Sequence, residues 1–157
     1  MASIIHASTV NHVNQAKELF AEYANSLEID LGFQNFDKEW KNLPGEYGAS
    51  VDGCLLLAVD NKQPCGCVAL RKIDEMTCEM KRLYVRPQWT GQGIGKRLAM
   101  SIIEEAKALG YRFMRLDTLP MMKQAVSLYQ SLGFYPIEPY RFNPFEGAMY
   151  LEVDLKN

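Results

Sequence analysis

The sequence lacks the features that would attach it to a membrane or to a nucleic acid. No apolar run approaches the length of a membrane span, and the first residues do not show the basic-then-apolar pattern of a secretory signal. The 17 lysines and arginines are balanced by 19 aspartates and glutamates, so the net charge of −2 leaves no positive excess for a polyanion. We therefore expect a cytoplasmic protein that binds neither a membrane nor a nucleic acid.

Residues that commonly bind metals are also scarce. The only two histidines, His6 and His12, lie near the N-terminus without an evident third ligand. The four cysteines follow none of the usual zinc-ligand spacings; they are Cys54, Cys65, Cys67 and Cys78. We expect no metal site, and we interpret the cysteines as small buried thiols in a reducing compartment.

The composition that remains is that of one globular domain. Of the 157 residues, 48% are hydrophobic and 23% are charged, which is ordinary for a soluble protein. A chain of this length buries roughly two-thirds of its unfolded surface without disulfides or metals. Because no repeat, linker or low-complexity segment interrupts it, residues 1–157 are expected to form a single domain.

Apolar periodicity and turn residues predict the elements in order along the chain. Asn11 is the expected N-cap of the first helix. The predicted strands are 4–10, 53–60, 65–73, 79–85, 113–116, 134–138 and 147–155, and the predicted helices are 12–29, 37–43, 94–109 and 121–132. Three antiparallel strands in succession, followed by alternating helices and strands, indicate an α+β fold with a mixed sheet and helices on both faces.

A strand, a glycine-rich turn and a helix follow one another between residues 79 and 109. Pro87 ends the strand, and Gly91, Gly93 and Gly95 then allow a ligand to approach the backbone closely. The free amides at the start of the following helix would face that ligand, which favours a phosphate-bearing cofactor. The spacing G-x-G-x-G is neither the dinucleotide fingerprint G-x-G-x-x-G nor a P-loop.

Two motifs together resemble those of the GCN5-related N-acetyltransferases. Gln88 to Gly93 matches the pattern Q-x-x-G-x-G of the family's acyl-CoA pyrophosphate loop. Ala125 to Phe134 matches the family's A-x-x-L-Y-x-x-x-G-F, whose tyrosine faces the cofactor sulfur. The resemblance covers roughly residues 65–135 and implies the three-layer α/β/α acyl-CoA N-acyltransferase fold, with a mixed, mostly antiparallel sheet.

The resemblance also implies roles for individual residues. Acetyl-CoA would be the acyl donor, Tyr129 would protonate the departing sulfur, and Glu79 occupies a strand position where some members carry a base. No metal is implied. The positions implied to bind the cofactor are Leu83, Val85, Gln88, Gly91, Gln92, Gly93, Gly95, Lys96, Ala125 and Tyr129.

Other positions bear on the cofactor and the acceptor less directly. Many members carry asparagine where this chain has Met122, so Thr118 or a backbone group would have to replace that cofactor contact. In the family the first helices line the acceptor pocket, and Arg141 could meet a carboxylate on the acceptor. The candidate aromatic contacts are Tyr23, Phe33 and Phe36, each of which could equally be a core residue.

The implied reaction is direct attack of an amine on acetyl-CoA within a ternary complex. We expect a primary amine of a small molecule as acceptor, because nothing in the sequence suggests a peptide-binding extension. A protein or peptide N-acetyltransferase and a non-catalytic acyl-CoA sensor are the alternatives. A homodimer is a further possibility that the resemblance raises.

Overall fold

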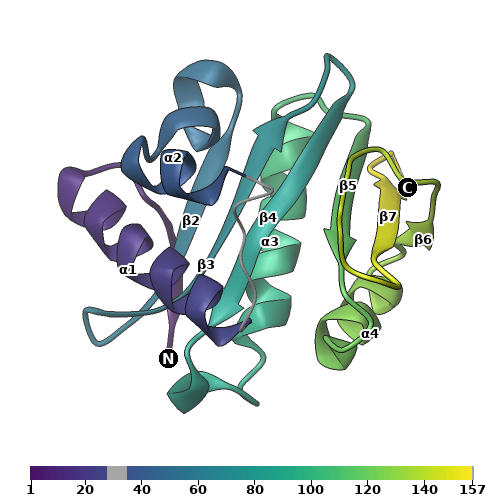
Figure 1. Cartoon of the computed structure of the whole chain (residues 1–157). Coiled ribbons are helices and arrows are strands. Elements are labelled where there is room, and N and C mark those ends of the chain that lie inside the picture. The colour runs from purple at the N-terminus through teal and green to yellow at the C-terminus, as the bar shows by residue number, and fades with distance from the viewer. Residues whose placement is uncertain (28–34, 157) are drawn as a thin grey trace.

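The computed structural model describes residues 1–27 and 35–156, and it contains one sheet of seven strands in the order β1-β2-β3-β4-β5-β7-β6 (Figure 1). The strands are β1 Ser3–His6, β2 Cys54–Asp60, β3 Gln63–Lys72, β4 Thr77–Val85, β5 Phe113–Thr118, β6 Tyr135–Pro136 and β7 Met149–Asp154. The helices are α1 Val10–Ser26, α2 Phe36–Lys41, α3 Ile94–Ala108 and α4 Lys123–Ser131. None of these helices is long and apolar enough to cross a membrane.

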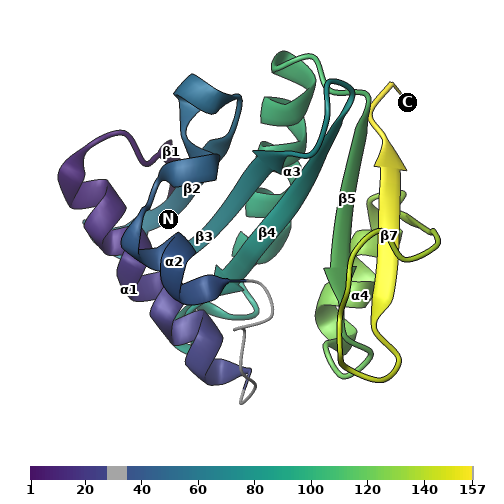
Figure 2. The ribbon, with the colours of Figure 1, turned by 45° about the horizontal axis from the view of Figure 1, so that its top comes forward.

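The sheet is antiparallel except at its centre, where β4 and β5 run parallel. These two strands pair over a short stretch, which ends at Glu79 opposite Arg115. Beyond that point β4 continues to Val85 without β5 beside it, and the two strands diverge (Figure 2). The predicted mixed, mostly antiparallel sheet is thus confirmed, and the divergence leaves one edge of β4 accessible at the centre of the molecule.

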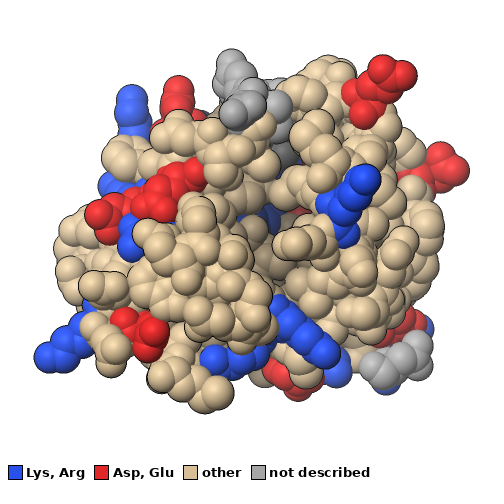
Figure 3. Space-filling view, turned by 90° about the horizontal axis from the view of Figure 1, so that it is seen from below, with Lys and Arg blue, Asp and Glu red and all other residues tan. Residues whose placement is uncertain are grey.

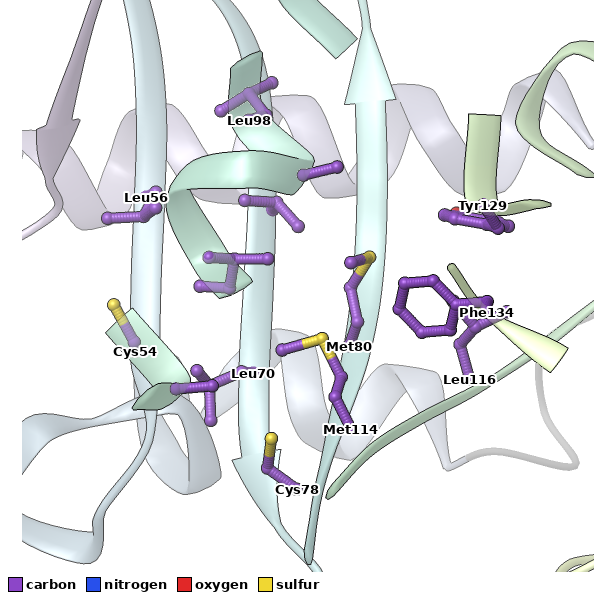
Figure 4. Close-up of a cluster of buried hydrophobic side chains, with 14 of the residues drawn as sticks. Cys54, Leu56, Leu70, Cys78, Met80, Leu98, Met114, Leu116, Tyr129 and Phe134 are labelled. Carbon is purple, nitrogen blue, oxygen red and sulfur yellow. The ribbon is translucent and has the colours of Figure 1, made fainter. Parts of the chain in front are cut away.

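Helices cover both faces of the sheet, as predicted, and each face has its own core. Leu19 and Phe20 of α1 pack with Leu57 of β2 on one face, where α2 also lies. On the other face, Leu98 and Ile102 of α3 belong to a larger cluster that includes Met80, Met114, Tyr129 and Phe134. Figure 4 shows Tyr129 and Phe134 side by side at the edge of this second cluster, next to Met80 and Leu116. The free cysteines are buried, as expected.

Two boundaries differ from the prediction for local reasons. The first strand ends at His6 rather than Val10, and α1 begins at Val10 because Thr9, not Asn11, is the N-cap. The Thr9 hydroxyl accepts a hydrogen bond from the backbone N–H of His12 at 3.1 Å, which satisfies one free amide of the first turn. The predicted strand 134–138 shortens to Tyr135–Pro136, although the Ile137 backbone N–H still donates to the Tyr150 carbonyl at 2.8 Å.

A β-bulge in β4 shapes the centre of the sheet. The register against β3 shifts between Cys67 and Ala69, so that an extra residue of β4 is accommodated near Arg82. Arg82 has a φ of 61°, and its carbonyl accepts a hydrogen bond from the Cys67 thiol at 3.3 Å. Bulges bend a strand, and this one lies where β4 leaves β5.

Candidate active site

The glycine turn before α3 forms an open cradle. Gly91 and Gly93 have φ values of +80° and +79°, a region that residues with a β-carbon avoid. A β-carbon added at either position would meet no atom of the protein within 4 Å, so the space above the turn is free for a ligand. Gly93 is the N-cap of α3, whose first-turn amides face this space by helix geometry. Free amides and the positive end of the helix dipole favour a phosphate here.

A groove of about 300 Å³ leads away from this cradle toward α4. Its lining is mainly apolar and comes from β4, the glycine turn, α4 and the C-terminal end of α1. It includes six of the residues predicted to bind the cofactor, namely Leu83, Val85, Gly91, Gly93, Gly95 and Ala125. Figure 3 views the molecule from this end and shows a face that is hollowed near its middle, with basic and acidic side chains interspersed around it.

The space between the diverging strands continues the groove into the sheet. It is narrow, about 40 Å³, and Tyr129 of α4 forms one of its walls opposite Leu83. The Tyr129 ring is 7% exposed and packs against Phe134 with 5.6 Å between ring centroids. Burial raises the pKa of the Tyr129 hydroxyl, so the phenol keeps its proton throughout the physiological range and can donate it.

A second pocket of about 300 Å³ lies on the α2 face of the sheet. Its wall combines the end of α2 and the turns after it with Arg71 of β3, Lys81 of β4 and Arg141 of the loop before β7. Lys81 also lines the space between β4 and β5, so its side chain forms part of the wall of both cavities.

Glu79 organises the inner wall of this second pocket. Its side chain is fully buried, yet its carboxylate has three donors. Arg71 donates from Nε at 2.8 Å to one oxygen, while Arg141 donates from Nη1 at 3.0 Å and Tyr140 from its hydroxyl at 2.6 Å to the other. Burial opposes the charged form, but nearby Lys81 and the two guanidinium groups outweigh it and lower the pKa of Glu79.

The ammonium of Lys81 lies in an environment that disfavours its charge. Burial lowers the pKa of Lys81 to about 8, and the neighbouring Arg82 and Arg141 act in the same direction. Glu79 and Glu39 oppose that shift without reversing it. About a tenth of the amine is therefore neutral at pH 7, far more than for an ordinary lysine.

The remaining predicted residues fall into two groups. Gln88, Gln92 and Lys96 are exposed and lie outside the lining of the groove. Tyr23 lines both the groove and the space between the strands, whereas Phe36 packs under the Arg82 guanidinium at 5.3 Å. Phe33 lies outside the described residues.

One cluster of possible metal ligands exists among the described residues, away from these pockets. His6, Cys54 and Glu105 bring ligand atoms within 4.8 Å of one another near the C-terminal end of α3. The two ring nitrogens of His6 face different partners, with Nδ1 3.8 Å from the Cys54 thiol and Nε2 2.9 Å from Glu105. Since an imidazole binds one ion through one nitrogen, the geometry suits a hydrogen-bonded group better than a metal.

A comparison with protein families identifies the family of this chain. The model described as "Acetyltransferase (GNAT) family" matches residues 14–134, which contain both the glycine turn and Tyr129. The chain belongs to this family. It is thus an acetyl-CoA-dependent N-acetyltransferase, and the cradle before α3 suits the diphosphate of its donor.

Individual relatives agree with this assignment. The acetyltransferase is 33% identical to an uncharacterized N-acetyltransferase of Dictyostelium discoideum, over 92% of this chain and 95% of the relative. It is 41% identical to an uncharacterized N-acetyltransferase of Schizosaccharomyces pombe, over 88% and 86%. A GNAT-family acetyltransferase structure from Staphylococcus aureus shares its fold with a TM-score of 0.82 at 19% identity, over 99% of both chains.

The departure at Met122 has a structural counterpart in this acetyltransferase. Met122 lies just before α4 and lines both the groove and the space between the strands. The Thr118 hydroxyl donates to the Met122 sulfur at 3.7 Å, so the two residues together occupy the wall where many members have asparagine.

Two residues that line the second pocket, Arg71 and Lys81, were not predicted from the sequence. The sequence pattern that could have indicated Lys81 is the alternation of charged residues along β4, at Glu79 and Lys81.

Proposed function

We propose that this acetyltransferase transfers the acetyl group of acetyl-CoA to a primary amine of a small molecule, by direct attack in a ternary complex. The observation that carries this proposal is the pocket of about 300 Å³ that meets the space between β4 and β5 at Lys81. Its volume suits a small acceptor, and its position would bring an amine to the donor from the opposite face of the sheet.

The donor would be held mainly by backbone groups. The amides of Gly91, Gly93, Gly95 and Lys96 would bind the diphosphate, and Ala125 leaves room for the pantetheine arm beside α4. Because β4 continues beyond its pairing with β5, its edge is available to that arm at Leu83 and Val85. Acetyl-CoA supplies the thioester, and we assign the Val85 amide as the donor to its carbonyl oxygen.

Three proton transfers would complete the reaction. The incoming ammonium must first lose a proton to a base. The neutral amine nitrogen then forms a bond to the acyl carbon, the carbon–sulfur bond breaks, Tyr129 gives its proton to the departing thiolate, and the second nitrogen proton returns to the Tyr129 oxygen as the amide forms. Glu79 stays our sequence-based prediction for that base, although its oxygens already accept three hydrogen bonds. Lys81 is the second candidate, because it lines the meeting point of both pockets and has a lowered pKa.

Thiol release from acetyl-CoA over a panel of amines tests the proposal. Amino acids, polyamines, aminoglycosides and peptides belong in the panel, with calorimetric binding of CoA measured in parallel. Release with small amines supports the proposal, whereas release with peptides alone indicates a protein acetyltransferase. Binding without release on any acceptor indicates an acyl-CoA sensor.

The location and assembly of the protein complete the proposal. We place it in the cytoplasm, where its four buried, free thiols would stay reduced. A homodimer stays a prediction, which light scattering on the purified protein would test.

A further inference from the structure

We propose that the acceptor carries a carboxylate as well as its amine, as in an amino acid, and that Arg71 and Arg141 bind this carboxylate. The inference rests on the proposed transfer to a small amine and names the class of molecule that the second pocket accepts. Three features carry it: the charge of the pocket, the way Glu79 holds the two arginines, and the position of Lys81.

The lining of this pocket is more cationic than anionic. Four cationic side chains, from Lys38, Arg71, Lys81 and Arg141, contribute to it, against two anionic ones from Glu39 and Glu46. One of these anions is already neutralised, because Glu39 receives two hydrogen bonds at 2.9 Å from the Arg82 guanidinium. Glu46 lies at the rim, with a side chain that is 73% exposed and a carboxylate 3.6 Å from Nη1 of Arg71. The buried Glu79 behind the wall adds a third carboxylate. The small excess of cations that is left would attract an anionic group.

Glu79 fixes the two guanidinium groups without using all of their donors. A guanidinium has five N–H groups in a rigid fork. The bonds to Glu79 use Nε of Arg71 and Nη1 of Arg141, and both arginines still line the pocket. One buried carboxylate thus holds two cations side by side that would otherwise repel each other. Their remaining N–H groups are suited to a second, incoming carboxylate.

The position of Lys81 indicates how the acceptor would be oriented in the pocket. Lys81 lies where the pocket meets the space between β4 and β5, so the reacting amine belongs at that end. Arg71 and Arg141 are bonded to Glu79, two residues before Lys81 on the same face of β4. A carboxylate bound there would be a short distance from the amine, which is the arrangement of an amino acid.

Matched acceptor pairs test this inference. We would compare amino acids with their primary amides, which keep the amine and the shape but lose the negative charge. The readout is the ratio of kcat/KM for the acid to kcat/KM for the amide, in the wild-type protein and in Arg71→Gln and Arg141→Gln. Each variant sees the same acceptors, so the difference in amine pKa between acid and amide cancels when these ratios are compared.

We expect the wild-type protein to prefer the acid and each arginine variant to lower that preference about 10- to 100-fold, as for loss of a hydrogen bond to a charged group. Arg112→Gln is the matched control, because Arg112 is ion-paired with Asp154 outside this pocket and should leave the ratio unchanged. Equal rates with amides or diamines in the wild-type protein, or an unchanged ratio in both variants, would overturn the inference.

A binding readout separates this inference from the proposed function. Calorimetry on the CoA-loaded protein, with the amino acid and its amide as titrants, measures recognition without turnover. If no amine releases thiol, the proposed function fails, and selective binding of the acid that is lost in Arg141→Gln still supports the carboxylate site. If amines are acetylated but acid and amide bind equally, the carboxylate site fails and the proposed function stands.

Discussion

At the scale of single residues, the chemistry depends on how burial changes each ionisable group. Tyr129, Glu79 and Lys81 are all largely buried, yet their surroundings shift them in different ways. Burial raises the pKa of the Tyr129 phenol, which stays protonated. The nearby cations lower the pKa of the Glu79 carboxyl, which stays ionised. Burial beside two arginines lowers the pKa of the Lys81 ammonium. Each shift suits a different role, and each role can be tested by one substitution.

Tyr129→Phe removes the hydroxyl and leaves the ring that packs against Phe134. We expect kcat to fall about 100-fold, a typical contribution of a general acid, while the Kd for CoA changes little. Steady-state kinetics and calorimetry on the same preparation measure both quantities. Because the pKa of Tyr129 is raised, the wild-type protein should show no loss of this acid below pH 10. An unchanged kcat in the variant would remove Tyr129 from the reaction.

Glu79→Gln keeps the size of the side chain and removes its charge. If Glu79 is the base, kcat should fall about 100-fold or more with every acceptor. If it instead positions Arg71 and Arg141, KM for a carboxylate-bearing acceptor should rise about 10-fold while kcat changes much less. Separate measurement of kcat and KM distinguishes the two, and thermal unfolding checks that the variant is folded.

If Lys81 is the base, kcat should depend on pH. Its pKa is lowered to about 8, so the neutral form that can accept a proton grows as the pH rises and dominates above pH 8. We expect kcat to increase from pH 6, to reach half of its maximum at about pH 8 and to level off above about pH 9. In Lys81→Arg, which stays charged, kcat should fall about 100-fold and the rise should vanish. The control is a second acceptor with a different amine pKa. A rise that follows the acceptor, or that persists in Lys81→Arg, would exclude Lys81 as the base.

At the scale of elements, the start of α3 determines whether the donor can bind. Gly93 and Gly110 lie at opposite ends of this helix, with φ values of +79° and +91°, and an added β-carbon has open space at both. Substitution by alanine should therefore cost each position a similar, modest stability of about 1 kcal/mol. Only Gly93→Ala should weaken CoA binding, because only there would the methyl group face the diphosphate. Thermal unfolding with and without CoA compares the two variants, and equal binding by both would contradict the proposed cradle.

The same scale shows which parts of the site could be predicted from the sequence. The glycine turn and the α4 motif could be recognised in the sequence because each is a short, contiguous segment. Arg71 and Arg141 were harder to place together, since Arg141 lies 62 residues from Glu79 and reaches it through an irregular loop. Arg71 lies opposite Glu79 only because of the register between β3 and β4. Such pairings depend on the assembled sheet and leave no local pattern.

At the scale of the whole molecule, the divergence of β4 and β5 opens the sheet between the groove beside the glycine turn and the pocket beside α2. The order of elements predicted the mixed sheet and the helices on both faces. It did not predict that the β4–β5 pairing would stop at Glu79, because the bulge near Arg82 arises from the pairing of β4 with β3. In the proposed reaction, donor and acceptor would therefore meet at the point where the sheet opens.

The most direct test of this account is a crystal structure of the protein with a non-hydrolysable acetyl-CoA analogue. We predict that the diphosphate accepts hydrogen bonds of about 3 Å from the backbone amides between Gly91 and Lys96. The sulfur should lie between β4 and β5, within hydrogen-bonding reach of the Tyr129 hydroxyl. A diphosphate bound elsewhere, or a sulfur remote from that hydroxyl, would contradict the account.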